Sequence, residues 1–254
     1  MDGKVLQEIP TGFSCTALEG KYFLVTGTGK YFKNVQVTPE VNLGLVRLTN
    51  GGETAQLLWG FADGGKFTSE FPAHMMSHAA RLKIDPQNHV VMHCHPANLL
   101  AMTYVHSLDE KAFTRTLWQM CMVFPGGVNV LPWMLCGTHE IGIATAEKMQ
   151  TARLVVWAQH GIYGAGKDLD ETFGLIKTAE KAAEIYRKIA HLPPAQYHHR
   201  RRDAPAGGPF RREGTGRVSV LISRRCNGAE KMRRPEGKPM HPLNRCCTRL
   251  MIFN

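Results

Sequence analysis

Two histidines one residue apart end an apolar run in HVVMHCHPANLLAMTYV, residues 89–105. Successive side chains of a strand point to opposite faces, so His93 and His95 share one face and Cys94 takes the other. Pro96 suits the first turn of a helix, where its missing N–H costs nothing. We therefore expect a strand-to-helix junction, where functional groups often lie in α/β folds. By itself the pair fits two polar residues at a strand end as well as it fits part of a metal site.

Further metal ligands are available elsewhere in the chain. His160, in LVVWAQHGIYGAG, ends another apolar stretch, and Glu70, in FTSEFPAH, lies at the start of an expected helix. Three histidines with one open position are the usual form of a catalytic zinc site. Three other histidines are rival ligands that we expect on the surface or on a helix face: His74, His78 and His89.

Hydrophobic periodicity and turn residues predict the elements that must position these groups. Strands are expected over residues 21–27, 43–48, 55–60, 89–95, 126–133 and, turning at His160-Gly161, over 152–166. Helices are expected over 69–83 with Ser69 as N-cap, 96–105, 138–150 capped by Thr138, and 168–189. The last helix has one apolar stripe, made of Phe173, Ile176, Ala179, Ala183 and Tyr186. Strands and helices mixed with short connections predict an α/β or α+β class in one domain.

The net charge of +10 is concentrated in the last quarter of the chain. Residues 1–186 carry 15 Lys and Arg against 17 Asp and Glu, whereas residues 187–254 carry 16 against 4. The later segment shows no sustained period, so we expect 191–254 to be a basic, disordered tail. We also expect a cytoplasmic protein without a signal peptide, a membrane span or a disulfide framework.

Five segments together resemble the class II aldolase and adducin family of zinc-dependent sugar-phosphate lyases. They are YFLVTGTGKYFKNVQ, TSEFPAH, HCHPANLLAMTYVH, FTRTLWQM and LDETFGLI, in order between about residues 21 and 186. The segments resemble the L-rhamnulose-1-phosphate aldolase branch more than the fuculose-phosphate aldolase and ribulose-phosphate epimerase branches. The resemblance implies an α/β, three-layer fold with a central mixed or antiparallel sheet covered by helices, formed by residues 1–190.

The resemblance also implies a site and a reaction. One zinc ion per subunit would be held by His93, His95 and His160, with Glu70 as resting ligand and acid/base. L-rhamnulose 1-phosphate would be cleaved to dihydroxyacetone phosphate and L-lactaldehyde, as in rhamnose catabolism. A Lewis acid offsets the negative charge that develops on the ketose fragment, and a nearby carboxylate can move a proton.

The substrate phosphate and the assembly follow from the same resemblance. The phosphate would lie at the Gly-rich turn around Thr28 and Gly29 and at Thr68-Ser69, because Gly-rich turns and helix N-termini aim N–H groups at anions. By itself TGTG also fits an ordinary tight turn. The family implies a homotetramer with sites between subunits.

Three departures from the family pattern separate the alternatives. The first is the lack of a Gly-Gly-Asn turn before Lys21. The second is a segment about four residues shorter between Trp118 and Phe124, with no glutamate between Trp118 and Glu140, where the family carries a second acid/base. The third departure is the basic tail. The alternative is therefore a degenerate relative that binds zinc with little or no aldolase activity. Nucleic-acid binding through the tail is weakly supported, since the basic run lacks interleaved aromatic residues.

Overall fold

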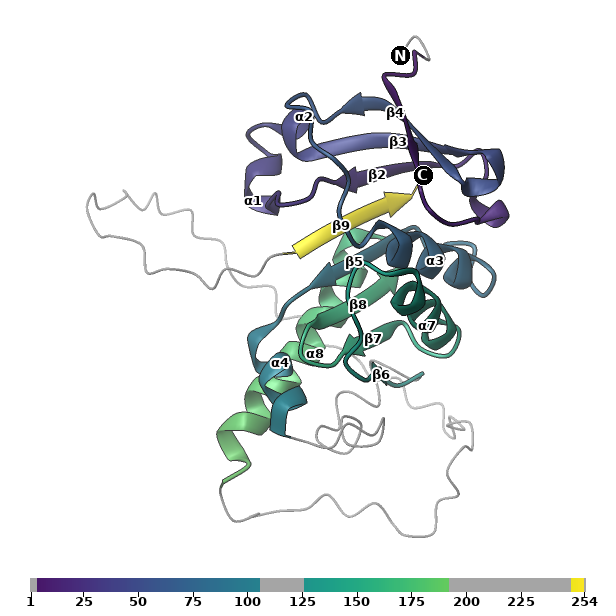
Figure 1. Cartoon of the computed structure of the whole chain (residues 1–254). Coiled ribbons are helices and arrows are strands. Elements are labelled where there is room, and N and C mark those ends of the chain that lie inside the picture. The colour runs from purple at the N-terminus through teal and green to yellow at the C-terminus, as the bar shows by residue number, and fades with distance from the viewer. Residues whose placement is uncertain (1–3, 106–125, 192–247, 254) are drawn as a thin grey trace, which may run out of the picture. The chain divides into compact units, whose positions relative to one another are not determined.

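The structure, a computed structural model, describes residues 4–105 and 126–191, and the backbone of residues 248–253 (Figure 1). These residues belong to one unit of the fold. Its strands are β1 (Gln7–Pro10), β2 (Tyr22–Thr26), β3 (Leu43–Thr49), β4 (Thr54–Gly60), β5 (Val90–Cys94), β6 (Asn129–Leu131), β7 (Leu154–Trp157), β8 (Gly161–Gly166) and β9 (Thr248–Phe253). Its α-helices are α1 (Phe32–Val35), α2 (Pro39–Asn42), α3 (Phe71–Leu82), α4 (Ala97–Val105), α7 (His139–Met149) and α8 (Leu169–Ile189).

The described strands form one mixed sheet in the order β1-β4-β3-β2-β9-β5-β8-β7-β6. Every pairing is antiparallel except β6 with β7, which is parallel. The hairpin expected around TNGGET is present as β3 and β4, joined by a short 3-10 turn at Asn50–Gly52. The strands β7 and β8 turn at His160-Gly161 as predicted.

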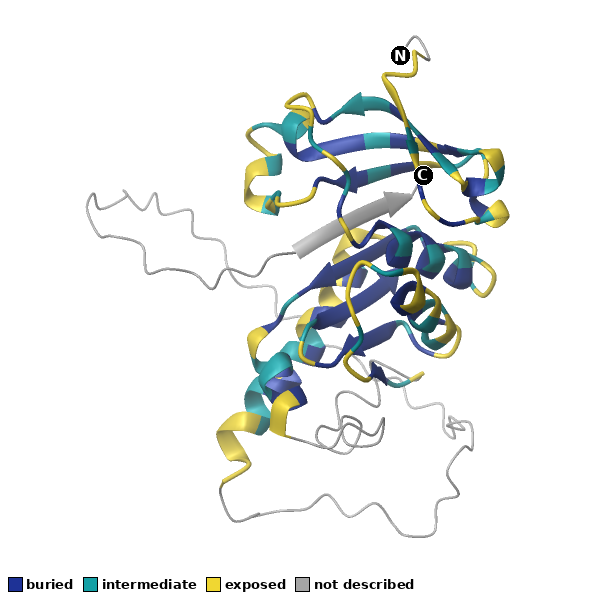
Figure 2. Cartoon of the chain, in the orientation of Figure 1, coloured by how far each residue is buried: buried dark blue, intermediate teal, exposed yellow. Residues whose placement is uncertain are grey.

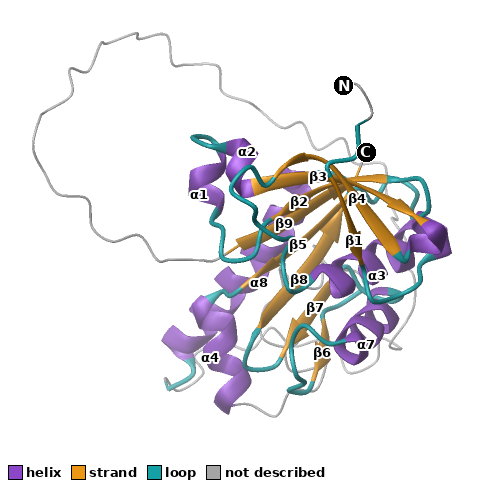
Figure 3. Cartoon of the chain, turned by 45° about the horizontal axis from the view of Figure 1, so that its top comes forward, coloured by secondary structure: helices purple, strands orange, loops and turns teal. Residues whose placement is uncertain are grey.

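Helices cover both faces of the sheet where β5, β8 and β7 lie together (Figure 3). The helices α4 and α8 pack on one face over Met92, Cys94 and Val156, and α3 and α7 pack on the other over Val91 and Val155. All residues of β5, β7 and β8 are buried (Figure 2). Alternate residues of these strands therefore serve two separate cores, and the predicted three-layer class is confirmed.

A carboxylate from α8 fixes the start of α4. Glu180 accepts hydrogen bonds from the backbone N–H groups of Asn98 (3.1 Å) and Leu99 (2.9 Å), and from the Asn98 side chain (2.7 Å). The first turn of a helix has N–H groups without intrahelical partners, and a negative charge there is favourable. This contact holds the junction that directly follows His95.

The predicted apolar stripe of α8 is wrong at one position. Phe173 is 54% exposed, whereas Thr172 and Leu175 are buried. The buried face of α8 includes Ile176, Ala179 and Ala183 as expected, but also Ala182, so the stripe lies slightly around the helix from the predicted one. Phe173 stands at the edge of that stripe, where helical spacing alone does not separate burial from exposure.

The expected tail differs from the structure in its last residues. Residues 192–247 and 254 lie outside the described part of the chain, so the expectation of a disordered tail is a prediction for them. The backbone of β9, however, pairs antiparallel with both β2 and β5. Its sequence, TRLMIF, is rich in β-branched, apolar and aromatic residues, which favour strands. The average composition of a basic segment does not reveal a strand this short.

None of the described helices is long and apolar enough to cross a membrane.

Candidate metal centre

His93 and His95 lie together at the end of β5, as strand alternation predicts. Their Nε2 atoms are 3.1 Å apart, and their rings meet edge to face with centroids 4.9 Å apart. Cys94 belongs to the apolar cluster on the opposite face, beneath α4 and α8. His93 is fully buried, while His95 is partly exposed. The pair thus presents one buried and one accessible imidazole to the same point.

His160 joins the pair from the turn between β7 and β8. Its ring centroid is 5.1 Å from that of His93 and 5.0 Å from that of His95. Gln159, just before it, has φ of 61°, a left-handed conformation that sharpens the turn. Gln159 is anchored by its N–H, which donates to the Thr103 hydroxyl at 2.9 Å. One nitrogen from each of the three histidines lies within 4.8 Å of the others.

The arrangement of these nitrogens fits a metal ion. Two nitrogens of a tetrahedral zinc site, each about 2.0–2.1 Å from the ion, lie about 3.3 Å apart, and the Nε2 atoms of His93 and His95 are 3.1 Å apart. His93 Nδ1 lies 3.2 Å from the carbonyl oxygen of Ile162. A metal-bound histidine typically donates its other N–H to such an acceptor, which fixes its tautomer. The structure therefore holds His93 with Nε2 toward the shared point.

Two large aromatic side chains support the histidines from behind. Tyr163 stacks on His93 with centroids 4.5 Å apart. Trp157 contacts the rings of His93 and His160, with centroids 5.3 and 5.2 Å apart. Its indole N–H donates to the buried Thr145 hydroxyl of α7 at 2.9 Å. Because the histidine rings rest on fully buried groups, their orientation is set by the core.

Glu70 approaches from the start of α3. The predicted N-cap, Ser69, is wrong by one residue: Glu70 is the N-cap, and its own N–H donates to the Thr68 hydroxyl at 3.2 Å. Glu70 is only 2% exposed. A carboxylate oxygen of Glu70, a nitrogen of His160 and the Cys136 sulfur lie within 4.8 Å of one another. The structure therefore brings Glu70 beside His160, as the expected site requires.

Cys136 is the residue of this centre that sequence reasoning missed. It lies between β6 and α7, two residues before Thr138, which caps α7 as predicted by accepting from the Ile141 N–H. A cysteine between a buried strand and a helix N-cap is a weak signal, because nothing in the local sequence indicates what it faces. Only the packing of α7 against α3 brings this loop to Glu70.

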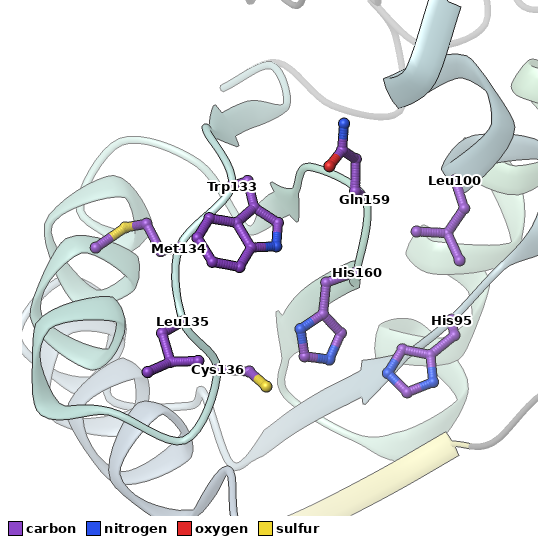
Figure 4. A pocket seen from close by; sticks show the side chains of 8 residues that line it. All are labelled: His95, Leu100, Trp133, Met134, Leu135, Cys136, Gln159 and His160. Carbon is purple, nitrogen blue, oxygen red and sulfur yellow. The ribbon is translucent and has the colours of Figure 1, made fainter.

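A cavity of about 370 Å³ opens at the histidines (Figure 4). His95 and His160 face one another across it, and Cys136 directs its sulfur toward the His160 ring. The remaining lining is mostly apolar and consists of Leu100, Trp133, Met134, Leu135 and Gln159. The cavity gives a small molecule access to the candidate ligands.

The two segments predicted to hold a phosphate meet at one antiparallel bridge. Gly27 and Phe67 form an antiparallel bridge, and the Thr28 N–H donates to the Lys66 carbonyl at 2.8 Å. The antiparallel register sets Thr28 opposite Lys66, and the Thr68 N–H donates to the Thr26 carbonyl at 3.0 Å, so Thr28-Gly29 and Thr68-Ser69 leave the bridge in opposite directions. It also commits the Thr28 N–H to the protein itself.

The side chains of the phosphate candidates differ in their exposure. Thr28, Gly29 and Ser69 are exposed, whereas Thr68 is buried and its hydroxyl accepts from the Glu70 N–H. Gly29 has φ of +69° with open space around its Cα, as a tight turn requires. The Ser69 carbonyl lies 3.6 Å from the Cβ position of Gly137, so this segment borders the Cys136 loop. The binding role of these four residues remains a prediction.

Two of the rival histidines lie on a helix face, which is one of the two places expected for them. His74 and His78 are fully buried on α3, where their rings contact Tyr163 (5.0 Å) and Phe23 (5.3 Å). His89 is partly exposed. None of the three belongs to a group of converging metal ligands within the described residues. They are therefore weaker candidates than His93, His95 and His160.

Comparison with known proteins agrees with this architecture. Residues 6–187 match the sequence model of the class II aldolase and adducin N-terminal domain. The chain belongs to this family. A rhamnulose-1-phosphate aldolase of Listeria monocytogenes is 61% identical over 187 residues, covering 72% of this chain and 68% of that protein. One of Enterococcus faecalis is 59% identical over 190 residues, covering 73% and 68%.

The fold of this class II aldolase family member also has a solved counterpart. The crystal structure of a sugar-phosphate aldolase from Thermotoga maritima superposes with a TM-score of 0.66 at 29% identity, covering 77% of this chain and 83% of that chain. The class II aldolase fold and the family resemblance predicted from sequence are thus confirmed. All candidate ligands fall inside the range matched by the family.

Proposed function

We propose that the chain is a zinc-dependent aldolase that cleaves L-rhamnulose 1-phosphate to dihydroxyacetone phosphate and L-lactaldehyde. The observation that carries this proposal is the convergence of three histidines beside a buried glutamate in a member of an aldolase family. Members of this family are typically metal-dependent. The substrate comes from relatives about 60% identical that are rhamnulose-1-phosphate aldolases.

His93, His95 and His160 hold one metal ion per subunit. Three imidazoles with an open fourth position favour zinc over magnesium or calcium, which prefer oxygen ligands. When bound, zinc would supply a Lewis acid that offsets the charge developing on the ketose oxygens. The aromatic support behind His93 and His160 keeps their nitrogens aimed at the open position. The partly exposed face of His95 leaves that position open to the cavity.

Glu70 carries the proton. Its carboxylate lies among the ligand atoms at His160, and its backbone is fixed at the start of α3. It can therefore rest near the ion and exchange a proton with a substrate hydroxyl when substrate occupies the cavity. One positioned acid/base contributes about 10²–10⁴-fold in rate.

Thr28, Gly29, Thr68 and Ser69 form the phosphate end of the site. Support comes from the bridge that joins the two segments at Gly27 and Phe67 and from the exposure of Gly29 and Ser69. The start of α3 favours negative charge. Thr68 acts indirectly, since its hydroxyl accepts from the Glu70 N–H. The phosphate would thus lie next to the acid/base residue.

A second candidate is a degenerate relative that binds zinc with little or no turnover. The sequence favours it because no glutamate stands between Trp118 and Glu140. Part of that segment lies outside the described residues. Hydrogen bonds from its own backbone and from the Thr138 hydroxyl hold the pKa of Glu140 below its usual range. This shift favours the ionised form of Glu140, which makes it less suited to replace the missing glutamate as a proton donor.

One experiment separates the two candidates. Retro-aldol cleavage of L-rhamnulose 1-phosphate is measured on a preparation whose zinc content is measured by mass spectrometry. An active aldolase shows one zinc per chain and a turnover of about 1–10³ s⁻¹. One zinc per chain without turnover identifies the degenerate relative.

Two variants test the assigned roles in the same assay. Glu70→Gln keeps the size of the side chain and should lower kcat by about 10²–10⁴-fold while zinc is retained. His93→Ala should lose zinc and activity together. Full zinc content in His93→Ala, or full activity in Glu70→Gln, contradicts the corresponding role.

The assembly is proposed as a homotetramer, as the family resemblance implies. Light scattering on a size-exclusion column measures the mass directly. A monomer with normal turnover would show that the sites are complete within one chain.

A further inference from the structure

The second group of metal ligands shares one histidine with the first. Glu70, Cys136 and His160 bring their ligand atoms within 4.8 Å of one another, as His93, His95 and His160 do. His160 is common to both groups, so its ring links Glu70 and Cys136 to the paired histidines of β5. Cys136 is exposed and lines the cavity with its sulfur directed at the His160 ring (Figure 4).

We propose that Cys136 is a sulfur ligand of the metal centre. Its thiolate binds the ion held at His160, in a position that it shares with the Glu70 carboxylate. This inference rests on the proposed function, since the ion is the one assigned to the three histidines. It adds a soft ligand to a set otherwise made of imidazole and carboxylate groups.

The distances allow this ligation with small side-chain movements. Ligand atoms of a tetrahedral zinc site lie about 3.3–3.8 Å apart, given Zn–N near 2.0–2.1 Å and Zn–S near 2.3 Å. The limit of 4.8 Å within the second group leaves roughly 1 Å to close between Cys136, Glu70 and His160. Cys136 can supply this movement, because its side chain is exposed and the loop continues into Gly137 at φ of +74°. Glu70 and His93 are buried and offer less freedom.

The sulfur ligand changes which ions the centre prefers. Thiolates favour zinc, cobalt and cadmium, whereas carboxylate and water suit magnesium, calcium and manganese. A centre with Cys136 should hold cadmium much more tightly than manganese. Removing the sulfur should reduce that preference without removing the three histidines.

Cobalt provides the direct test. The wild-type chain and Cys136→Ser are loaded with Co²⁺, and their absorption spectra are compared. We expect a near-ultraviolet sulfur-to-cobalt charge-transfer band in the wild type that is absent in Cys136→Ser, while both keep the visible bands of bound Co²⁺. Cys15→Ser is the matched control, because Cys15 lies in the separate core of β2, β3 and β4, and it should keep the charge-transfer band.

Two further measurements use other probes. Cd²⁺ should slow alkylation of Cys136, followed by peptide mass spectrometry, and leave the rate at Cys15 unchanged. Cys136→Ser should lower Cd²⁺ affinity by about tenfold or more and leave Mn²⁺ affinity unchanged. Even the loss of a residue that only hydrogen-bonds a metal ligand typically weakens metal binding by about 10–100-fold. Cys136→Ala repeats the comparison without a hydroxyl that could bind the ion.

The outcomes distinguish this inference from the function on which it rests. Bound Co²⁺ with identical spectra in wild type and Cys136→Ser overturns the sulfur ligand and leaves the histidine centre standing. A wild-type chain that binds no Co²⁺ overturns both. Loss of the band in Cys15→Ser as well would assign the change to folding and reject Cys136 as the ligand.

Discussion

Replacing Gly161 by alanine should damage the metal centre through direct steric overlap. Gly161 starts β8 immediately after His160. A Cβ atom there would lie 2.5 Å from the Cys94 carbonyl oxygen, 2.8 Å from His93 Cε1 and 2.9 Å from His95 Cδ2. Carbon atoms normally pack at about 3.5–4.0 Å. Both histidine rings would therefore have to move by roughly 0.6–1.2 Å, or the two strands would have to separate.

The size of the effect follows from these overlaps. Inserting one methyl group into a packed region typically costs about 1–3 kcal/mol. For a domain of this size, each kcal/mol shifts Tm by about 2–4 °C, so Tm should fall by roughly 2–12 °C. The loss of metal affinity should be larger than the loss of stability suggests, because functional groups need placement within about 0.5 Å. We expect at least a tenfold weaker binding of zinc.

Zinc affinity is measured by competition with a chromophoric chelator, and Tm by circular dichroism. Gly174→Ala is the matched control, since a Cβ on this exposed glycine of α8 meets nothing within 4 Å. Alanine inside a helix is about 0.8–1.0 kcal/mol more favourable than glycine, so the control should gain stability and keep its zinc affinity. Unchanged zinc affinity in Gly161→Ala would refute the steric argument.

Three other predictions concern the surroundings of the site. Trp157→Phe removes the indole N–H that donates to Thr145. It should lower the free energy of unfolding in urea by about 1–3 kcal/mol and weaken zinc binding. Equal zinc affinity would show that the Trp157 ring does not position the histidines. Glu180→Ala removes the acceptor for the first turn of α4 and should lower the free energy of unfolding by about 0.5–2 kcal/mol, measured by urea unfolding. An unchanged free energy would mean that water replaces the Glu180 carboxylate. The pKa of Glu184 is lowered to about 2, and a hydrogen bond from Lys188 is the largest cause. The stability that ionised Glu184 contributes is therefore present above about pH 4.5 and is lost as the pH falls toward 2. Glu184→Gln should flatten stability over that window at low salt only, because the group is exposed; an unchanged pH profile would contradict this.

The sequence predicted those features that depend on local periodicity. Strand alternation alone placed His93 and His95 on one face and Cys94 on the other. The apolar periods also located α3, α4, α7 and α8 to within a few residues. Thr138 was predictable as a cap because its hydroxyl acts within its own turn. Each of these features is fixed by neighbours along the chain.

Features set by tertiary packing were not predictable in the same way. The helix α3 packs against both the sheet and α7, so polar residues on more than one side of it are buried. That is why His74 and His78 lie inside the protein although they occupy a helix face. The approach of Cys136 to Glu70 also depends on this contact between helices far apart in sequence. The family resemblance indicated His160 and Glu70, but spacing alone left rival histidines open.

The presence of His160 in both ligand groups sets a time at which metal can first bind during synthesis. A ribosome that has made the chain as far as residue 150 has already released most of β5 and α3 but has not yet supplied this histidine. Metal binding stabilises a fold only when its ligands have converged. Neither ligand group is therefore complete until the turn at His160 has emerged, and β1 to β4 are made before that point. Pairing among these first four strands does not depend on the ion, whereas β8 and β9 join β5 after its last ligand has been made.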